Sequence, residues 1–282
     1  MRKGSLLAGA AVVAVAAQAS LAAFTITNGN AVFEYPGSNT NPFSNSSSNA
    51  YNFRPEGGTS TDHVFYYNWG YRVPLGSNTG LSALVSPTIS NPDAATVVLD
   101  MPNNGPGPVG QNRFDSKVTI RVTDGALPGE AQLDSALEVR AAASNNGPVT
   151  FQFFHVVDVD FNGTAINDTF NITNASGVDG TVVDSVLTAP AVLGEYRGVG
   201  ANLYQLGGSS AMRGIINGSS NANLNNTATF AGDGAYGFQW TVTLAPGESA
   251  TFNSSFRTVV PEPAMIGLFA AAAPTLLRRR RA

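Results

Sequence analysis

Apolar and polar residues alternate along several short segments of the chain, and this period of two is typical of strands with one buried face. In Lys117–Thr123, the residues Val118, Ile120 and Val122 share one face, and polar residues occupy the other. Gln239–Leu244 repeats the alternation. We therefore expect a strand at each of these two segments.

The segment Glu130–Ala143 is compatible with either a helix or a strand. It is rich in residues that favour helices. In its second half, however, Leu137, Val139 and Ala141 alternate with charged residues. This alternation favours a strand for the second half.

Turn-forming residues separate the predicted strands. Breaks rich in Gly, Pro and Asn occur at 103–106 and 145–148. Pro246–Glu248 joins Gln239–Leu244 to a stretch that contains Phe252 and Phe256, and we expect a last hairpin there. Short strands at this spacing predict an all-β fold, with an antiparallel β-sandwich body over 23–260.

The composition limits the classes of function. Of 282 residues, 43% are hydrophobic and 12% are charged, so the chain can bury a sizeable core. Cys is absent, which excludes disulfides, thiolate nucleophiles and cysteine-ligated metal sites. Without its two ends, the body carries nine basic and 18 acidic residues, a net charge of −9, which disfavours binding to nucleic acid.

The N-terminus has the pattern of a secretory signal peptide. Arg2 and Lys3 form a basic start, Leu6–Ala17 is apolar, and the small residues Ala19 and Ala22 suit signal peptidase. We expect residues 1–22 to be a cleaved signal peptide. An uncleaved membrane anchor is the alternative.

The C-terminus combines a proline motif, an apolar stretch over 264–277 and a basic block, whose residues are Pro261, Glu262, Pro263 and then Arg278, Arg279, Arg280 and Arg281. The apolar stretch predicts a short hydrophobic helix that enters a bilayer, and the arginines act as a cytoplasmic stop signal. The prolines keep the chain around Glu262 extended, so that a membrane protease can thread it. The 14 residues of the stretch would span about 21 Å as a helix, less than the ~30 Å core of a bilayer.

This tail resembles the PEP-CTERM sorting domain of exported proteins from Gram-negative bacteria that make exopolysaccharide. The resemblance covers 261–282 and implies an exosortase that recognises Pro261–Pro263, cleaves the tail and passes the protein to the cell surface or matrix. The implied partners are signal peptidase, an exosortase-like enzyme and exopolysaccharide, with transient anchoring in the inner membrane. A simple membrane anchor and an exposed helix are the alternatives for the tail.

Two blocks of the body, Tyr67–Val73 and Asp158–Thr164, are similar to uncharacterised exported proteins with the same kind of tail. The likeness supports a β-rich body and implies no activity.

The second block also matches the first half of a calcium-binding loop. Alternate acidic residues before a tight glycine turn can bring several oxygens to one ion. The last position of such a loop holds Thr169 in place of the usual Glu. We take Asp158, Asp160, Asn162 and Asp168 as candidate calcium ligands, with a turn capped by its own Asp and Asn side chains as the alternative.

Three other patterns suggest no catalytic residue. Gly232–Gly237 contains G-x-G-x-x-G, but strand-like residues follow it, so we interpret it as a turn and not as a dinucleotide site. His155 alternates with Phe151 and Phe153, which favours a packing role. His63 is next to an Asp, but neighbours on a strand face opposite sides.

Tyr67, Trp69 and Tyr71 would share one face of an extended strand. Flat aromatic rings with polar edges can stack on sugars, so these three residues are a candidate glycan platform. Burial in the core is the alternative, and the more frequent fate of such residues.

Together, these features predict an exported surface or matrix protein that is non-catalytic and binds exopolysaccharide. The first alternative is a secreted carbohydrate-active enzyme that acts on the same polymer, and the second is a structural module stabilised by calcium.

Overall fold

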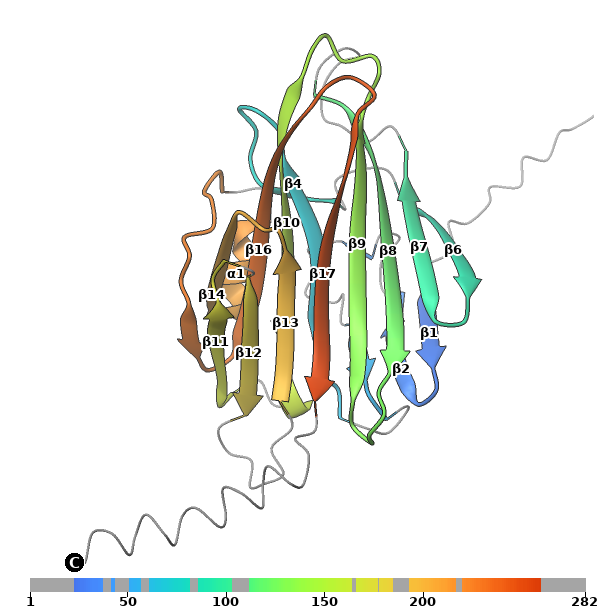
Figure 1. The fold of residues 1–282 in the computed structure, drawn as a ribbon, viewed down its shortest axis with the longest axis vertical. Coiled ribbons are helices and arrows are strands. Elements are labelled where there is room, and N and C mark those ends of the chain that lie inside the picture. Colours follow the sequence, from blue (N-terminus) through green and yellow to red (C-terminus); the bar gives the residue numbers. More distant parts are fainter. Residues whose placement is uncertain are drawn as a thin grey trace, which may run out of the picture.

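The computed structural model of the protein describes residues 23–37, 42–43, 51–56, 61–81, 86–102, 112–163, 166–176, 178–184, 193–216 and 220–259. They form antiparallel sheets that pack together, and this confirms the all-β prediction (Figure 1). The expected signal peptide, the Pro261–Pro263 motif, the apolar stretch and Arg278–Arg281 lie outside the described residues. Among the residues that are described, no helix is long and apolar enough to cross a membrane.

The largest sheet has nine strands, which lie side by side across the view of Figure 1. In spatial order, its strands are β15 (Thr229–Ala231), β11 (Asp168–Asn174), β12 (Asp179–Asp184), β13 (Leu193–Val199), β17 (Ser249–Val259), β9 (Ala131–Ala141), β8 (Phe114–Asp124), β7 (Thr96–Met101) and β6 (Thr88–Asp93).

A five-stranded sheet forms the second layer, and a three-stranded sheet packs against the same core. The second layer contains β14 (Leu203–Gly208), β16 (Gly234–Leu244), β10 (Val149–Val159), β4 (Tyr66–Arg72) and β5 (Thr79–Gly80). The small sheet contains β1 (Phe24–Asn28), β2 (Ala31–Tyr35) and β3 (Asn52–Arg54). A helix, α1 (Ser209–Ile215), and a short 3-10 helix (Phe161–Gly163) complete the described elements.

Aromatic residues join the three sheets through one core. Phe33 of β2 lies against Tyr67 of β4, with ring centroids 5.4 Å apart. Phe53 of β3 lies against Phe256 of β17, with centroids 5.9 Å apart. All four side chains are buried in the same cluster. One continuous hydrophobic core therefore joins the three sheets, and a second, smaller cluster lies between the five-stranded sheet and α1.

The strands differ in how their residues alternate. Along β8 and β9, each buried residue is followed by a partly or fully exposed one, because only the inner face of these strands is covered. Both predicted alternating segments are strands, and β9 extends the predicted strand to the first half of its segment. In contrast, β10 is buried at seven consecutive positions, because its outer face lies beneath α1 and Leu224.

The predicted last hairpin is wrong, because β16 and β17 belong to different sheets. The turn between them is tied to the end of β9: the Gly247 amide donates to the Ala141 carbonyl, and the Ala141 amide donates to the Glu248 carbonyl, both at 2.9 Å. The chain therefore crosses from one layer to the other. Trp240 and Phe252 still meet in the core, with centroids 5.7 Å apart. A hairpin and a crossover between layers would both point Trp240 and Phe252 inward, so alternation alone does not distinguish a hairpin from a crossover.

Candidate functional site

Three aspartates converge where β10 ends and β16 begins. Asp158 and Asp160 face the same side, because alternate residues of an extended strand share a face. The β10–β16 register sets Asp158 opposite Ala235 and Val159 opposite Gly234, which brings Asp233 level with Asp160. One carboxylate oxygen from each aspartate lies within 4.8 Å of the others. We call these three residues the acidic cluster.

The three carboxyl groups differ in exposure. Asp158 is only 2% exposed, whereas Asp160 is half-buried and Asp233 is exposed. Arg213 of α1 places its Nε 3.6 Å from Oδ2 of Asp158, and its guanidinium lies 5.8 Å from the ring centroids of both Phe65 and Tyr66. The other oxygen of Asp158, Oδ1, is buried and has no hydrogen-bond partner. The acidic cluster therefore contains one buried carboxyl oxygen that accepts no hydrogen bond.

Burial raises the pKa values of two members of the acidic cluster, Asp158 and Asp160. It raises the pKa of Asp158 to about 8; the Arg213 charge lowers this pKa, and the charges of Asp160, Asp233 and Asp168 raise it. Burial also raises the pKa of Asp160, and Asp233 adds to that effect. At neutral pH, the Asp158 carboxyl group is therefore mostly protonated, which is unusual for an aspartate.

The acidic cluster could hold a metal ion. Its membership differs from the predicted ligand set, because Asp233 joins Asp158 and Asp160. Asp168 is fully buried, and its Oδ2 accepts a hydrogen bond from the Phe161 amide at 3.1 Å. This bond holds Asp168 to the 3-10 helix. Asp168 is not a member of the acidic cluster. The side chain of Asn162 lies outside the described part of the structure.

Asp233 lies within the Gly232–Gly237 segment that the sequence indicates to be a turn. Only Gly232 and Asp233 form a bend, because β16 already begins at Gly234; the expectation that no helix follows is correct. What the sequence analysis missed is the pairing of β16 with β10, which brings the Asp233 carboxylate to the other two. Both strands are strongly apolar, but their register depends on contacts between distant segments.

The candidate glycan platform is not on the surface. Tyr67, Trp69 and Tyr71 are 2%, 0% and 4% exposed, and all three belong to the core. Trp69 stacks on Trp240, with centroids 5.4 Å apart. A sugar has no access to these rings, so the platform prediction is wrong and the alternative of core packing is right. The nine-stranded sheet covers this face of β4, which the local pattern does not reveal.

His155 and His63 are also buried, and burial lowers their pKa values to about 3 and about 4. The His155 ring stacks on Trp69 at a centroid distance of 4.3 Å, and its Nδ1 lies 2.9 Å from Oγ of Ser254 in the opposite sheet. His155 is therefore a neutral packing residue in the core, as its alternation with two phenylalanines indicates.

No family model and no curated protein matches the sequence. Solved structures with a similar fold include a bacterial glucoamylase in complex with acarbose, at 7% identity and a TM-score of 0.47, covering 79% of this chain and 31% of that one. A protein from the human microbiome assigned as a kojibiose phosphorylase matches at 10% identity and a TM-score of 0.43, covering 94% and 34%. A protein from Escherichia coli K12 assigned as an aldose 1-epimerase matches at 9% identity and a TM-score of 0.40, and the match covers 85% of this chain and 99% of that one.

These comparisons contradict the expectation of a non-catalytic body. All three structures carry the names of enzymes that act on carbohydrates. This chain spans about a third of the length of the first two. At such low identities and TM-scores, the likeness assigns no activity and no residue to this chain. Its function has to be argued from its own side chains.

Proposed function

We propose that the protein is an exported carbohydrate-active enzyme whose acid–base centre is the acidic cluster. One observation carries the proposal: three carboxyl groups meet within 4.8 Å in environments of very different burial. Neighbouring carboxyl groups with different proton affinities are the arrangement that provides an acid and a base at the same pH. Strongly perturbed pKa values also concentrate at functional sites.

Each aspartate takes a different role. Asp160 is the proton donor, because its pKa is raised and its half-buried side chain is accessible from solvent. Asp233 is exposed and serves as the carboxylate that attacks the sugar. Asp158 is a positioning residue: it stays protonated behind the other two and is held at 3.6 Å from Arg213.

The reaction is hydrolysis of a glycosidic bond in two steps. Asp160 gives its proton to the glycosidic oxygen, the carbon–oxygen bond breaks, and an oxygen of Asp233 bonds to the sugar carbon. Water then replaces Asp233 and returns a proton to Asp160. Retaining enzymes hold their carboxyl groups about 5–5.5 Å apart, whereas enzymes that place a water between them need about 6.5–9.5 Å. The separation within 4.8 Å favours the first class.

The substrate that fits the export signals is an extracellular polysaccharide. The signal peptide would take the chain across the inner membrane, and the tail at 261–282 would anchor it there until an exosortase-like enzyme cuts at Pro261–Pro263. The enzyme would then act at the cell surface or in the matrix. The acidic body, with no basic stripe, suits a polymer that carries little negative charge.

Release of reducing ends from a panel of soluble polysaccharides tests the proposal, with Asp160→Asn and Asp233→Asn as variants. Each variant should lose about 10²- to 10⁴-fold in kcat/KM, the usual contribution of an acid–base group. Asp100→Asn is the matched control, because Asp100 is an exposed strand aspartate outside the acidic cluster. Cleavage by both cluster variants at the wild-type rate would disprove the assignment.

The acidic cluster has a second candidate role as a calcium site. The buried Oδ1 of Asp158, which lacks a hydrogen-bond partner, favours it, because a cation would satisfy that oxygen. Calcium prefers carboxylate oxygens, and exposed Asp233 would leave room for water ligands. A bound ion would require all three groups to be deprotonated. Saturating calcium should therefore inhibit the acid–base reaction.

Thermal unfolding with calcium and with chelator separates the two roles. Calcium at 100 times its dissociation constant should stabilise the folded state by about 2.7 kcal/mol. Asp158→Asn should remove this response. If the melting temperature is the same in calcium and in chelator, calcium does not bind to the folded protein.

A further inference from the structure

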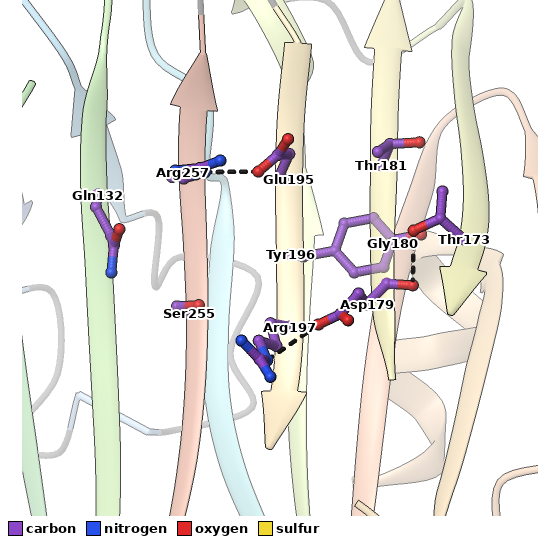
Figure 2. Close-up of a pocket in the computed structure, with 10 residues that line it drawn as sticks. All are labelled: Gln132, Thr173, Asp179, Gly180, Thr181, Glu195, Tyr196, Arg197, Ser255 and Arg257. Atoms are coloured by element: carbon purple, nitrogen blue, oxygen red, sulfur yellow. Dashed lines mark hydrogen bonds and ion pairs between the residues drawn. The ribbon is translucent and has the colours of Figure 1, made fainter. Parts of the chain in front are cut away.

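The outer face of the nine-stranded sheet carries a polar groove that the acid–base proposal does not use. It lies over β11, β12, β13, β17 and β9 and has a volume of about 430 Å³ (Figure 2). The acidic cluster lies on the other side of the molecule, because Asp158 shares the outer face of β10 with Phe154 and Val156 beneath α1. The groove is therefore a separate surface.

Two ion pairs cross the groove from strand to strand. Nε of Arg257 lies 2.6 Å from Oε2 of Glu195, and Nε of Arg197 lies 3.0 Å from Oδ1 of Asp179. The members of each pair are directly opposite in the strand register, so all four side chains point outward (Figure 2). The arginines are more than half exposed. Exposed pairs of this kind add little to stability.

The groove matches the chemistry of a neutral saccharide. Sugar hydroxyls both donate and accept hydrogen bonds, and the lining offers both functions: guanidinium donors from Arg257, acceptors from Glu195, and the hydroxyls of Thr181 and Ser255. Each guanidinium and each carboxylate is held in place by its partner, which lowers the entropic cost of binding.

Charge and shape disfavour other ligand classes. Both arginines are paired with carboxylates, so a polyanion would have to displace Glu195 or Asp179. A protein partner usually places an apolar or aromatic anchor in a pocket. The one aromatic residue of the lining, Tyr196, is 1% exposed and stacks on Tyr236 in the core.

The groove continues towards the β8–β9 turn. A second hollow of about 150 Å³ shares Gln132 and Arg257 with it and reaches Thr123 and Glu130. Continuity across neighbouring strands suits an extended chain better than a single sugar. No described helix or strand covers this face of the sheet in Figure 1.

We propose that this groove binds an extended, neutral saccharide chain, independently of the acidic cluster and on the opposite side of the molecule. A polymer held there would keep the protein attached to its matrix whether or not cleavage takes place. The proposal concerns binding only and does not depend on the acid–base function.

Affinity electrophoresis in gels that contain dextran, a β-glucan or a galactomannan tests the groove, with alginate as a polyanionic probe. The full chain should be retarded by at least one neutral polymer and not by alginate. Arg257→Ala and Glu195→Gln should each weaken binding about tenfold, the loss expected for hydrogen bonds to a charged group. Lys117→Ala is the matched control, because it removes an ion pair with Glu138 on the same sheet face outside the groove.

Three results would overturn the proposal: no retardation by any neutral polymer, retardation by alginate alone, or equal retardation of the wild type and both groove variants. Circular dichroism of Arg257→Ala checks that the variant is folded. Asp160→Asn separates the two proposals, because it should keep wild-type retardation. Binding without any cleavage would leave the groove in place and reject the acid–base function.

Discussion

The two outer faces of the sandwich differ in what lies over them. On the five-stranded sheet, Phe154 and Val156 of β10 are buried beneath α1. On the nine-stranded sheet, the outward positions of β8 hold residues such as Thr119 and Arg121, which are partly or fully exposed. On the covered face, β10 therefore places apolar residues on both of its sides at 153–154 and 156–157, whereas the open face permits polar residues on the outer side.

The same difference governs the carboxylates. On the covered face, Asp158 is 2% exposed with one arginine at 3.6 Å, and burial raises its pKa to about 8. On the open face, Glu195 lies 2.6 Å from Arg257, and both side chains are at least one third exposed. Water and salt screen the open pair. Cover by other parts of the chain, more than the distance to a partner, therefore decides how far a carboxyl group is shielded from water.

The largest effect should come from emptying the covered face. Phe154→Ala removes a fully buried ring that packs in the cluster of Met212 and Ile216, so the free energy of unfolding should fall by about 3–5 kcal/mol. Urea denaturation measures this loss. A loss below about 1 kcal/mol would mean that the side chains beneath α1 are poorly packed.

A smaller, pH-dependent effect is expected for Asp158→Asn. The pKa of Asp158 is raised from 3.8 to about 8 in the folded state, so the folded protein binds more protons than the unfolded chain between these values. This group stabilises the fold at low pH, and the stabilisation declines as pH rises towards 8. The side chain at this position does not titrate in the variant. The free energy of unfolding of the variant, compared with that of the wild type, should therefore rise by about 1 kcal/mol for each unit of pH from about pH 5 to about pH 7.

Parallel urea titrations of the wild type and Asp158→Asn at the two pH values measure this difference. Burial lowers the pKa of His155 to about 3, so this residue reduces the stability of the folded protein as pH falls below the ordinary histidine pKa. His155 is present in both proteins, so its contribution cancels. A difference that does not change with pH would show that Asp158 is ionised in the folded protein.

The smallest effect should come from the open face. Thr119→Ala shortens an outward, partly exposed side chain in the middle of β8, so stability should change by no more than about 0.5 kcal/mol. The same urea titration measures it. A loss comparable to that of Phe154→Ala would indicate that a further part of the chain covers this face.

Local patterns predict the strands but not how they pair. Alternation in Lys117–Thr123 and Gln239–Leu244 correctly indicates β8 and β16, because each strand has a side that faces the core. It does not indicate that the turn at Pro246–Glu248 crosses between layers, because hairpin and crossover bury the same residues. It also does not distinguish an exposed aromatic face from one beneath a second sheet, as Trp69 demonstrates.

The acidic cluster is predictable in part for the same reason. Asp158 and Asp160 are two residues apart, so their common face follows from the geometry of one strand. Asp233 lies far along the chain, and only the pairing of β10 with β16 brings it to Asp160. The perturbed pKa of Asp158 depends in turn on α1, which covers that face.

The position of β17 has a consequence for how the protein is made. This strand is the last one described, yet it lies in the interior of the nine-stranded sheet, between β13 and β9. Until it emerges, β9 and β13 each lack a neighbour and expose unpaired backbone groups, which invite aggregation. The sheet therefore closes only when synthesis of the body is nearly complete, and long-range pairing of this kind is slow.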